Sequence, residues 1–239
     1  MAQTQIPNVN ADFIKVDPFG NIYAVKKSQL SKFSPQGKLL FTYSDKTLGV
    51  ISSMDVFNPM KIMLFYQDAG VLVFLNEQLA PINNSVSLFE ANYFSISLAS
   101  YSAANQIHLY DEVNKYLITM DFFMREISKT PIHFSGFNPV KMIELEEKSL
   151  ALHDPKTGVY LFDAFSTFNK LIPVITSQPI EVTSELIYFT RDKEIAIYNY
   201  KTMSTLTQQL PVSDVLQTLI HRNNMIILLQ DGTVWIHEL

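Results

Sequence analysis

The most constraining feature of the chain is one module, residues 16–40, which reads VDPFGNIYAVKKSQLSKFSPQGKLL. Residues 17–21 (DPFGN) predict a reverse turn, because the proline fixes φ, the glycine allows a positive φ, and the Asp and Asn side chains bond the backbone. Residues 22–25 are rich in strand formers, and residues 30–33 alternate with the period of a half-buried strand. A second turn, SPQG, then leads into a strand over residues 38–43. The module therefore predicts short antiparallel strands joined by tight turns.

The alternating pattern of residues 30–33, which ends on an aromatic or imidazole side chain, recurs along the chain. Its six copies begin at positions 30, 71, 107, 159, 195 and 234. Four copies follow, by nine residues, an apolar residue that starts a partner strand: Ile62, Leu150, Leu186 and Met225. A period of roughly 40 residues is typical of a four-stranded propeller blade. We therefore predict an all-β fold, a six-bladed β-propeller of four-stranded antiparallel blades, in which each copy is the third strand of its blade.

Closure of such a propeller needs one more strand, because the sequence ends at Leu239 directly after the last third strand. We expect the N-terminal segment, within residues 3–9, to supply the missing outer strand. Residues 1–239 are then a single propeller domain without a linker. The hydrophobic share of 47% is enough for a continuous core. With only seven glycines, many turns are expected to use Asn, Asp or Pro.

Composition also limits compartment and partners. The chain has no cysteine, which excludes disulfides, thiolate nucleophiles and Cys-type zinc sites, and no run of about 20 apolar residues that would predict a transmembrane segment. A net charge of −5 with three arginines argues against nucleic acid as a partner. The start Met1-Ala2-Gln3 suggests a mature terminus left by signal-peptide removal, hence a periplasmic or cell-surface protein; a cytoplasmic protein is the alternative. We expect a monomer.

Residues 12–43 resemble one blade of the NHL-type six-bladed propellers, which combine an Asp, a Gly-Asn turn, an Ile-Tyr-Val strand, a Lys-Phe strand and a second Gly turn. The sequence departs from that pattern at Lys26 and Lys27, where an Asp often follows the first strand. The resemblance implies a fold that hosts lactonases and lyases with calcium or zinc in the central channel, as well as protein-binding modules. The fold alone does not choose between them.

A channel metal site would need carboxylates, amides or imidazoles converging from different blades. The candidates near predicted inner strands are Asp12, Asp55, Glu90, Glu144, Glu181, Asp214 and His221. The histidines lack any zinc-ligand spacing, and no nucleophile elbow or phosphate loop occurs. Four acids at equivalent turns are interpreted as turn residues: Asp68, Asp154, Asp192 and Asp231. We therefore predict no catalytic residue, no metal site and no cofactor.

The largest irregularity of the repeat lies between the copies at positions 107 and 159, which are 52 residues apart. It leaves an extended connector, residues 121–136, before an inner strand expected near residues 140–145. Long loops on one face of a repeat protein often bind partners. We therefore predict a partner-binding surface in this connector: Phe122, Phe123, Met124, Arg125 and Ile127. Alternatively, the two phenylalanines extend an outer strand in which alternate residues are buried.

The sequence thus favours a non-enzymatic protein-binding or scaffold propeller. Richness in Asn, Lys, Phe and Ile with few Arg resembles cell-envelope proteins of the Bacteroidota, where such a propeller could be accessory to an outer-membrane type IX secretion channel. The expected partner is then another protein of the envelope. The alternative function is a calcium-dependent lactonase or lyase with its metal in the channel.

Overall fold

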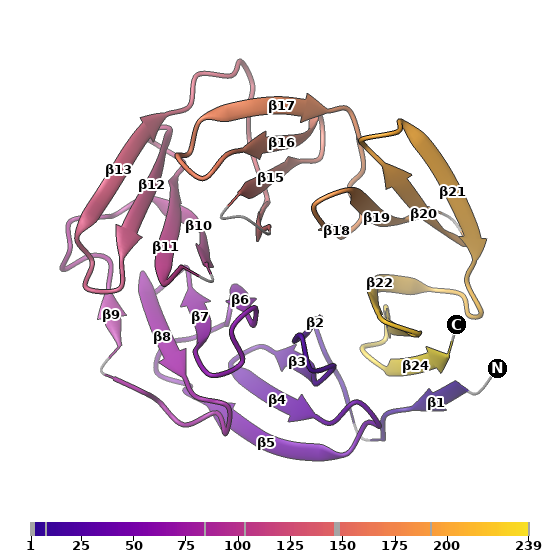
Figure 1. The fold of residues 1–239 in the computed structure, drawn as a ribbon. Coiled ribbons are helices and arrows are strands. Elements are labelled where there is room, and N and C mark those ends of the chain that lie inside the picture. The colour runs from indigo at the N-terminus through magenta and orange to yellow at the C-terminus, as the bar shows by residue number, and fades with distance from the viewer. Residues whose placement is uncertain are drawn as a thin grey trace. The chain divides into compact units, whose positions relative to one another are not determined.

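The computed structural model is all-β, and its strands form six four-stranded antiparallel sheets. It describes residues 3–7, 9–83, 85–102, 104–145, 149–191 and 193–238. In every sheet the strands follow one another in chain order, except that the last sheet takes its fourth strand from the N-terminal segment (Figure 1). The predicted fold class, a six-bladed β-propeller with four-stranded blades, is confirmed. No helix long and apolar enough to cross a membrane occurs among these residues.

The chain divides into two compact units, and the first consists of Met1–Thr47, Gln78–Ala80 and Gln178–Leu239. It holds three sheets. The first comprises β2 (Phe13–Val16), β3 (Ile22–Lys26), β4 (Gln29–Phe33) and β5 (Leu39–Ser44). The fifth comprises β18 (Ile180–Val182), β19 (Leu186–Arg191), β20 (Glu194–Asn199) and β21 (Ser204–Gln209). The sixth comprises β22 (Val215–His221), β23 (Asn224–Leu229), β24 (Val234–Glu238) and β1 (Gln3–Gln5).

The second unit consists of Leu48–Glu77 and Pro81–Ser177 and holds the remaining sheets. The second sheet comprises β6 (Ser53–Asp55), β7 (Ile62–Tyr66), β8 (Val71–Leu75) and β9 (Val86–Ser87). The third comprises β10 (Ile96–Tyr101), β11 (Gln106–Asp111), β12 (Tyr116–Asp121) and β13 (Glu126–Pro131). The fourth comprises β14 (Lys141–Glu144), β15 (Leu150–Asp154), β16 (Gly158–Phe162) and β17 (Phe168–Ile172). Whether residues 1–239 act as a single domain stays a prediction.

The opening module folds as its turn residues predict. Asp17 carries the first turn: one carboxylate oxygen accepts from the backbone N–H groups of Phe19 and Asn21, each at 2.9 Å, and the other accepts from the Tyr23 hydroxyl at 3.0 Å. Gly20 has a φ of +88°, the conformation for which glycine was predicted. The turn therefore fixes the register of β2 against β3.

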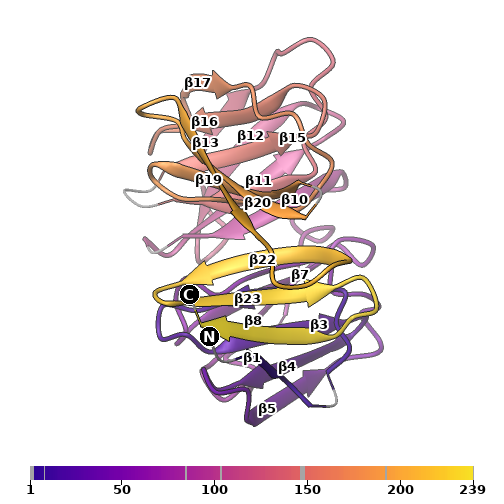
Figure 2. The ribbon, with the colours of Figure 1, turned by 90° about the vertical axis from the view of Figure 1, so that its right-hand side faces the viewer.

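The N-terminal strand completes the sixth sheet, as expected. β1 runs antiparallel to β24, with Thr4 opposite Ile236 and Gln5 opposite Trp235. Figure 2 shows β1 together with β22 and β23, which belong to the same sheet. Ile6 follows with 1% of its surface exposed, and its N–H donates to Val234 O at 2.9 Å. It joins a core cluster with side chains of the first and sixth sheets. Burying an isoleucine contributes roughly 1.5–3 kcal/mol, so β1 is held by packing as well as by pairing.

One strand assignment from the repeat was wrong. The copy at residues 107–110 lies in β11, the second strand of its sheet, and the third strand is β12. The β12 residue equivalent to Val71 and Val159 is Leu117. The spacings of the third strands are then 41, 46, 42, 36 and 39 residues, and the apparent 52-residue gap disappears. The pattern missed β12 because Met120, fully buried, stands where the other copies have an aromatic or imidazole side chain. Second and third strands are both buried on two faces, so both satisfy one apolar pattern.

The scarcity of glycine is compensated by other residues in left-handed conformations. Asn92, Asn105 and Asp214 have φ values of 64°, 57° and 58°, as expected for Asn and Asp. Lys27 and Arg222, both at 53°, occupy similar turns. The expectation of Asn, Asp or Pro turns is therefore correct only in part, since longer side chains also occupy these positions.

Candidate functional site

The predicted connector, residues 121–136, is a hairpin turn followed by a strand. β12 ends at Asp121, residues 122–125 form the turn, and the fourth strand β13 begins at Glu126. One Asp121 carboxylate oxygen accepts from the N–H groups of Phe123 at 2.9 Å and Arg125 at 3.0 Å. The expectation of an inserted loop is therefore wrong. The alternative, that Phe122 and Phe123 extend an outer strand, is also not met, because both residues precede β13. The inner strand β14 does lie within the expected residues 140–145.

Phe122 points inward from this turn and contacts a lysine of the preceding sheet. Its ring packs edge-on against Phe74 at 5.0 Å between centroids, and the Lys61 ammonium lies 3.1 Å from its centroid. The same ammonium lies 5.4 Å from the centroid of the Tyr101 ring. Burial lowers the pKa of Lys61. This cation–π contact joins the β6–β7 turn to the β12–β13 turn, so Phe122 holds the β12–β13 turn in place. Its side chain is half-buried and packs against the core cluster of this unit.

Phe123 is the exposed member of the pair, with 77% of its surface accessible, and Ile127 on β13 is 53% exposed. The Arg125 guanidinium lies 5.6 Å from the Phe123 ring centroid and forms an ion pair with Asp121 at 2.6 Å. Met124, with a φ of 62°, packs partly against the core. Of the five predicted partner-binding residues, the structure therefore presents Phe123, Arg125 and Ile127 to solvent; their role in binding stays a prediction.

The next sheet repeats this turn with another exposed phenylalanine. In the β16–β17 turn, one Asp163 carboxylate oxygen accepts from the N–H groups of Phe165 and Thr167, each at 2.9 Å, and Ser166 takes the left-handed conformation with a φ of 60°. Phe165 is 80% exposed. Phe123 and Phe165 thus occupy the same position of equivalent hairpins in neighbouring sheets of the second unit.

Sequence reasoning missed Phe165, although a signal was present: in both turns an Asp stands two residues before the exposed Phe. It also missed the exposed apolar residues of the β6–β7 turn, Phe57 at 40% and Met60 at 60%. Met60 directly precedes Lys61, the residue that contacts Phe122. We define the hairpin-tip patch as Phe57, Met60, Phe123 and Phe165.

The acids proposed as channel metal ligands do not come together. Among the described residues, no group of three or more His, Asp or Glu side chains is arranged to hold a metal ion. Asp12 is bonded to Lys26 Nζ at 2.6 Å and Lys27 N at 2.8 Å; burial alone would raise its pKa, but these bonds hold it below the usual range. Glu90 lies in the turn after β9 and Asp214 in the turn before β22.

Glu144 instead forms a buried pair with His108. His108 Nε2 lies 3.8 Å from Glu144 Oε2, with both side chains almost fully buried. Burial, together with the nearby charge of Asp55, raises the pKa of Glu144 to about 8, and burial lowers the pKa of His108 to about 4. Both shifts favour the uncharged forms of the two side chains. His108, which the repeat had placed in a third strand, lies in the second strand β11.

A short chain of hydroxyls continues from His108 into the next sheet. His108 Nδ1 lies 3.1 Å from Thr119 Oγ1, which lies 3.1 Å from the hydroxyl of buried Ser166. Because Ser166 belongs to the β16–β17 turn and Thr119 to β12, these bonds fasten the third sheet to the fourth. None of these side chains is an exposed nucleophile, and the hydrogen bonds are best explained as a structural link between the two sheets.

Glu181 has a structural role in the first unit. Its carboxylate lies 3.5 Å from Lys15 Nζ and 3.3 Å from the side-chain amide nitrogen of Gln217. Gln217, on β22, also donates to Ile14 O and accepts from Ile14 N, each at 3.0 Å. The Gln217 side-chain amide thus takes the place of a neighbouring strand and satisfies the backbone N–H and C=O groups of Ile14 on β2.

Two of the four turn acids agree with their interpretation as turn residues. Asp154 accepts from the N–H groups of Lys156 and Asn138, each at 2.8 Å, and Asp231 accepts from Thr233 N at 2.9 Å. Asp68 lies exposed in the β7–β8 turn, and Asp192 lies outside the described residues.

Comparison with solved structures shows the fold. A β-propeller domain of Cps50 (Swd1) from Myceliophthora thermophila superposes with a TM-score of 0.66 at 8% identity, covering 99% of this chain and 98% of that one. An inactive virginiamycin B lyase from Staphylococcus aureus, solved with quinupristin, gives 0.69 at 8% identity, covering 100% and 98%. PorZ of Porphyromonas gingivalis, described as an essential bacterial surface component of the type IX secretion system, gives 0.56 at 11% identity, covering 97% of this chain and 37% of that one. Neither a protein-family model nor a curated protein sequence matches the chain.

Proposed function

We propose that the protein is a non-enzymatic binding module that engages another protein through the hairpin-tip patch. The observation that carries this proposal is the repetition of an exposed phenylalanine, Phe123 and Phe165, at the same position of two neighbouring hairpins. Aromatic side chains are enriched in the buried centres of protein interfaces. Both turns are fixed by Asp-to-backbone hydrogen bonds, so the backbone that carries the rings has little conformational entropy to lose on binding.

The patch suits a partner with an apolar surface. Arg125, the only guanidinium in the β12–β13 turn, is paired with Asp121, so the tip offers little net charge. The Lys61 ammonium lies over the Phe122 ring and near the Tyr101 ring. Recognition is then expected to depend on aromatic burial and to change little with salt.

We further propose a place in the bacterial envelope, periplasmic or at the cell surface, with a role accessory to an outer-membrane secretion channel of the type IX kind. The support is the composition of the chain together with the fold shared with PorZ. Fractionation of cells that express the natural protein tests this location. Recovery with cytoplasmic markers would contradict it.

Site-specific photo-cross-linking tests the binding role. A photoreactive phenylalanine analogue at Phe123 is expected to capture one defined partner from envelope extracts. The same group at Val113 is the matched control, because Val113 is 71% exposed in the β11–β12 turn, at the opposite end of the same sheet.

Substitution separates binding from folding. The double variant Phe123→Ser/Phe165→Ser is expected to weaken capture of that partner at least tenfold, whereas Val113→Ser leaves it unchanged. Equal capture by both variants, with unchanged thermal midpoints, would overturn the proposal.

A further inference from the structure

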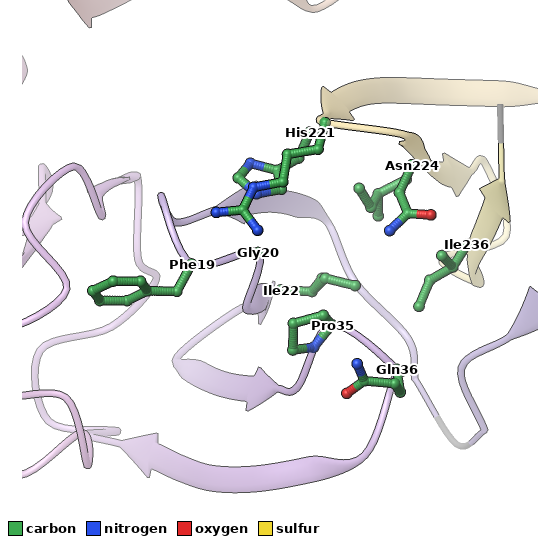
Figure 3. Close-up of a pocket in the computed structure, with 10 residues that line it drawn as sticks. Phe19, Gly20, Ile22, Pro35, Gln36, His221, Asn224 and Ile236 are labelled. Atoms are coloured by element: carbon green, nitrogen blue, oxygen red, sulfur yellow. The ribbon is translucent and has the colours of Figure 1, made fainter.

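A pocket of about 200 Å³ lies between the first and sixth sheets, within the first unit (Figure 3). Three turns surround it: the β2–β3 turn with Phe19 and Gly20, the β4–β5 turn with Pro35 and Gln36, and the β22–β23 turn with Arg222. It shares no residue with the hairpin-tip patch. The pocket is therefore separate from the surface proposed to bind a partner protein.

The floor of the pocket is aliphatic. Ile22 and Ile226 are 1% and 3% exposed and belong to the core cluster between the two sheets, against which Ile236 also packs. Gly20 lets the His221 ring lie close to the backbone, since a Cβ there would be 3.3 Å from His221 Cδ2. The Phe19 ring, 66% exposed, stands at the side of the pocket (Figure 3). This floor suits a branched aliphatic side chain.

The rim of the pocket is polar and carries one positive charge. Gln36 and Asn224 offer side-chain amides, and Arg222 offers a guanidinium (Figure 3 shows the two amides). No acid is among the described lining residues, and within the described chain Arg222 forms no ion pair or hydrogen bond. Asp17, whose negative charge acts on His221, is buried, and its carboxylate accepts hydrogen bonds within its own turn and from Tyr23. The Arg222 guanidinium, which is exposed to solvent, is thus accessible to a ligand in the pocket.

We propose that this pocket binds a carboxylate that carries a branched aliphatic side chain, with Arg222 pairing the carboxylate and Ile22, Ile226 and Ile236 receiving the side chain. A guanidinium matches the two oxygens of a carboxylate in a planar fork. Phosphate, with its higher charge, is less suited to a pocket with a single cation. The C-terminal residue of a peptide carries both groups on one carbon, whereas an internal acidic side chain offers the carboxylate without the branched group, and the probes distinguish the two.

Calorimetric titration of the full-length protein tests the site with three small probes. N-acetyl-L-leucine presents a terminal carboxylate and a branched side chain, and we expect it to bind in the millimolar range. N-acetyl-L-leucinamide, which lacks the charge, is expected to bind about tenfold more weakly. N-acetyl-L-glutamate α-amide presents an internal acid; tighter binding of this probe than of N-acetyl-L-leucine would overturn the aliphatic part of the proposal.

Arg222→Gln is expected to lower the affinity for N-acetyl-L-leucine about tenfold and leave that for the leucinamide unchanged. Arg191→Gln is the matched control, because it removes the same charge from exposed Arg191 at the end of β19 and should not alter binding. The ligand should also raise the thermal midpoint of the unmodified protein, since it binds only where two sheets meet. Equal binding of acid and amide, or no effect of Arg222→Gln, would overturn the proposal.

Discussion

At the scale of single residues, adjacent side chains in one turn have opposite roles. Phe122 lies under the Lys61 ammonium and holds the turn to the preceding sheet, whereas Phe123 is presented to solvent. The Asp121 carboxylate fixes the turn backbone and so decides which ring points inward. A substitution at Phe122 is therefore expected to affect stability first, and one at Phe123 to affect binding first.

The buried pair of His108 and Glu144 predicts an unusual dependence of stability on pH. The pKa of Glu144 is about 8 in the folded protein and near 4.5 when unfolded, so the folded state holds the extra proton between these values and stability falls as pH rises. The pKa of His108 is about 4 in the folded protein and near 6.5 when unfolded. Between these values the unfolded state holds the extra proton, so the contribution of His108 to stability rises as pH rises. Between pH 6.5 and 8 only the Glu144 effect remains.

We therefore expect the free energy of unfolding to fall by about 1–2 kcal/mol from pH 6.5 to 8. Urea unfolding at several pH values measures it. In Glu144→Gln this fall should be largely absent, because the amide does not ionise. Parallel curves for the two proteins would show that Glu144 is already ionised at pH 6.5.

At the scale of elements, the third-to-fourth strand hairpins share one design. In the first, third and fourth sheets an Asp or Ser side chain accepts two backbone N–H groups of its own turn, and a bulge follows in the ladder. Phe123 and Phe165 occupy the same place in this design, which in the first sheet is taken by Gln36. The scaffold thus allows the tip residue to vary.

Close approach of backbones makes one glycine indispensable to the fourth sheet. Gly158 begins β16 with a φ of +125°, and a Cβ there would overlap the carbonyl oxygen of Ile172 at the end of β17. Gly158→Ala is expected to lower the free energy of unfolding by roughly 2–4 kcal/mol. Gly136→Ala is the control: its φ is +70° but nothing lies within 4 Å, so only the backbone cost of about 1 kcal/mol is expected. Equal losses in urea unfolding would argue against the clash.

Packing of the N-terminal segment gives a second element-scale prediction. Ile6→Ala removes a side chain buried between the first and sixth sheets and should cost about 2–4 kcal/mol in urea unfolding. Thr4→Ala, on the exposed face of β1, should stay within about 0.5 kcal/mol. If Ile6→Ala has as little effect as Thr4→Ala, β1 contributes nothing to stability.

At the scale of the whole molecule, the fold is shared with proteins of different function. The choice between a binding module and an enzyme therefore depends on the chemistry of the described side chains. Interior acids that could have formed a metal site are individually engaged, Glu181 with Lys15 and Glu144 with His108. Each of these contacts joins side chains of two different sheets. The proposal of a binding module, with the lactonase or lyase as its alternative, rests in part on these contacts.

Removal and addition of calcium tests this preference directly. A metal bound only by the native state would raise its stability. We expect the thermal midpoint to be the same after chelation and after addition of millimolar calcium, with no heat of binding in calorimetry. Micromolar binding with a raised midpoint would instead support a metal-dependent enzyme.

The sequence alone determined the elements that depend on local chemistry. The Asp17 turn, the strands of the first sheet, the antiparallel pairs and the strand β1 follow from turn residues, from alternation and from an apolar period near 40 residues. The same local pattern misassigned the strand at residues 107–110, because second and third strands are equally buried and Met120 replaces an aromatic side chain.

Only the tertiary structure decided which side chains meet. The Phe122 ring is partly covered because the Lys61 ammonium, distant in sequence, lies over it. The pKa of Glu144 is raised because burial removes water from its carboxyl group and the charge of Asp55 lies nearby. The pocket with Arg222 arises where the first and sixth sheets adjoin, and no local pattern marks it. Strands and turns are set by neighbours along the chain, whereas burial, charge state and pockets are set by neighbours in space.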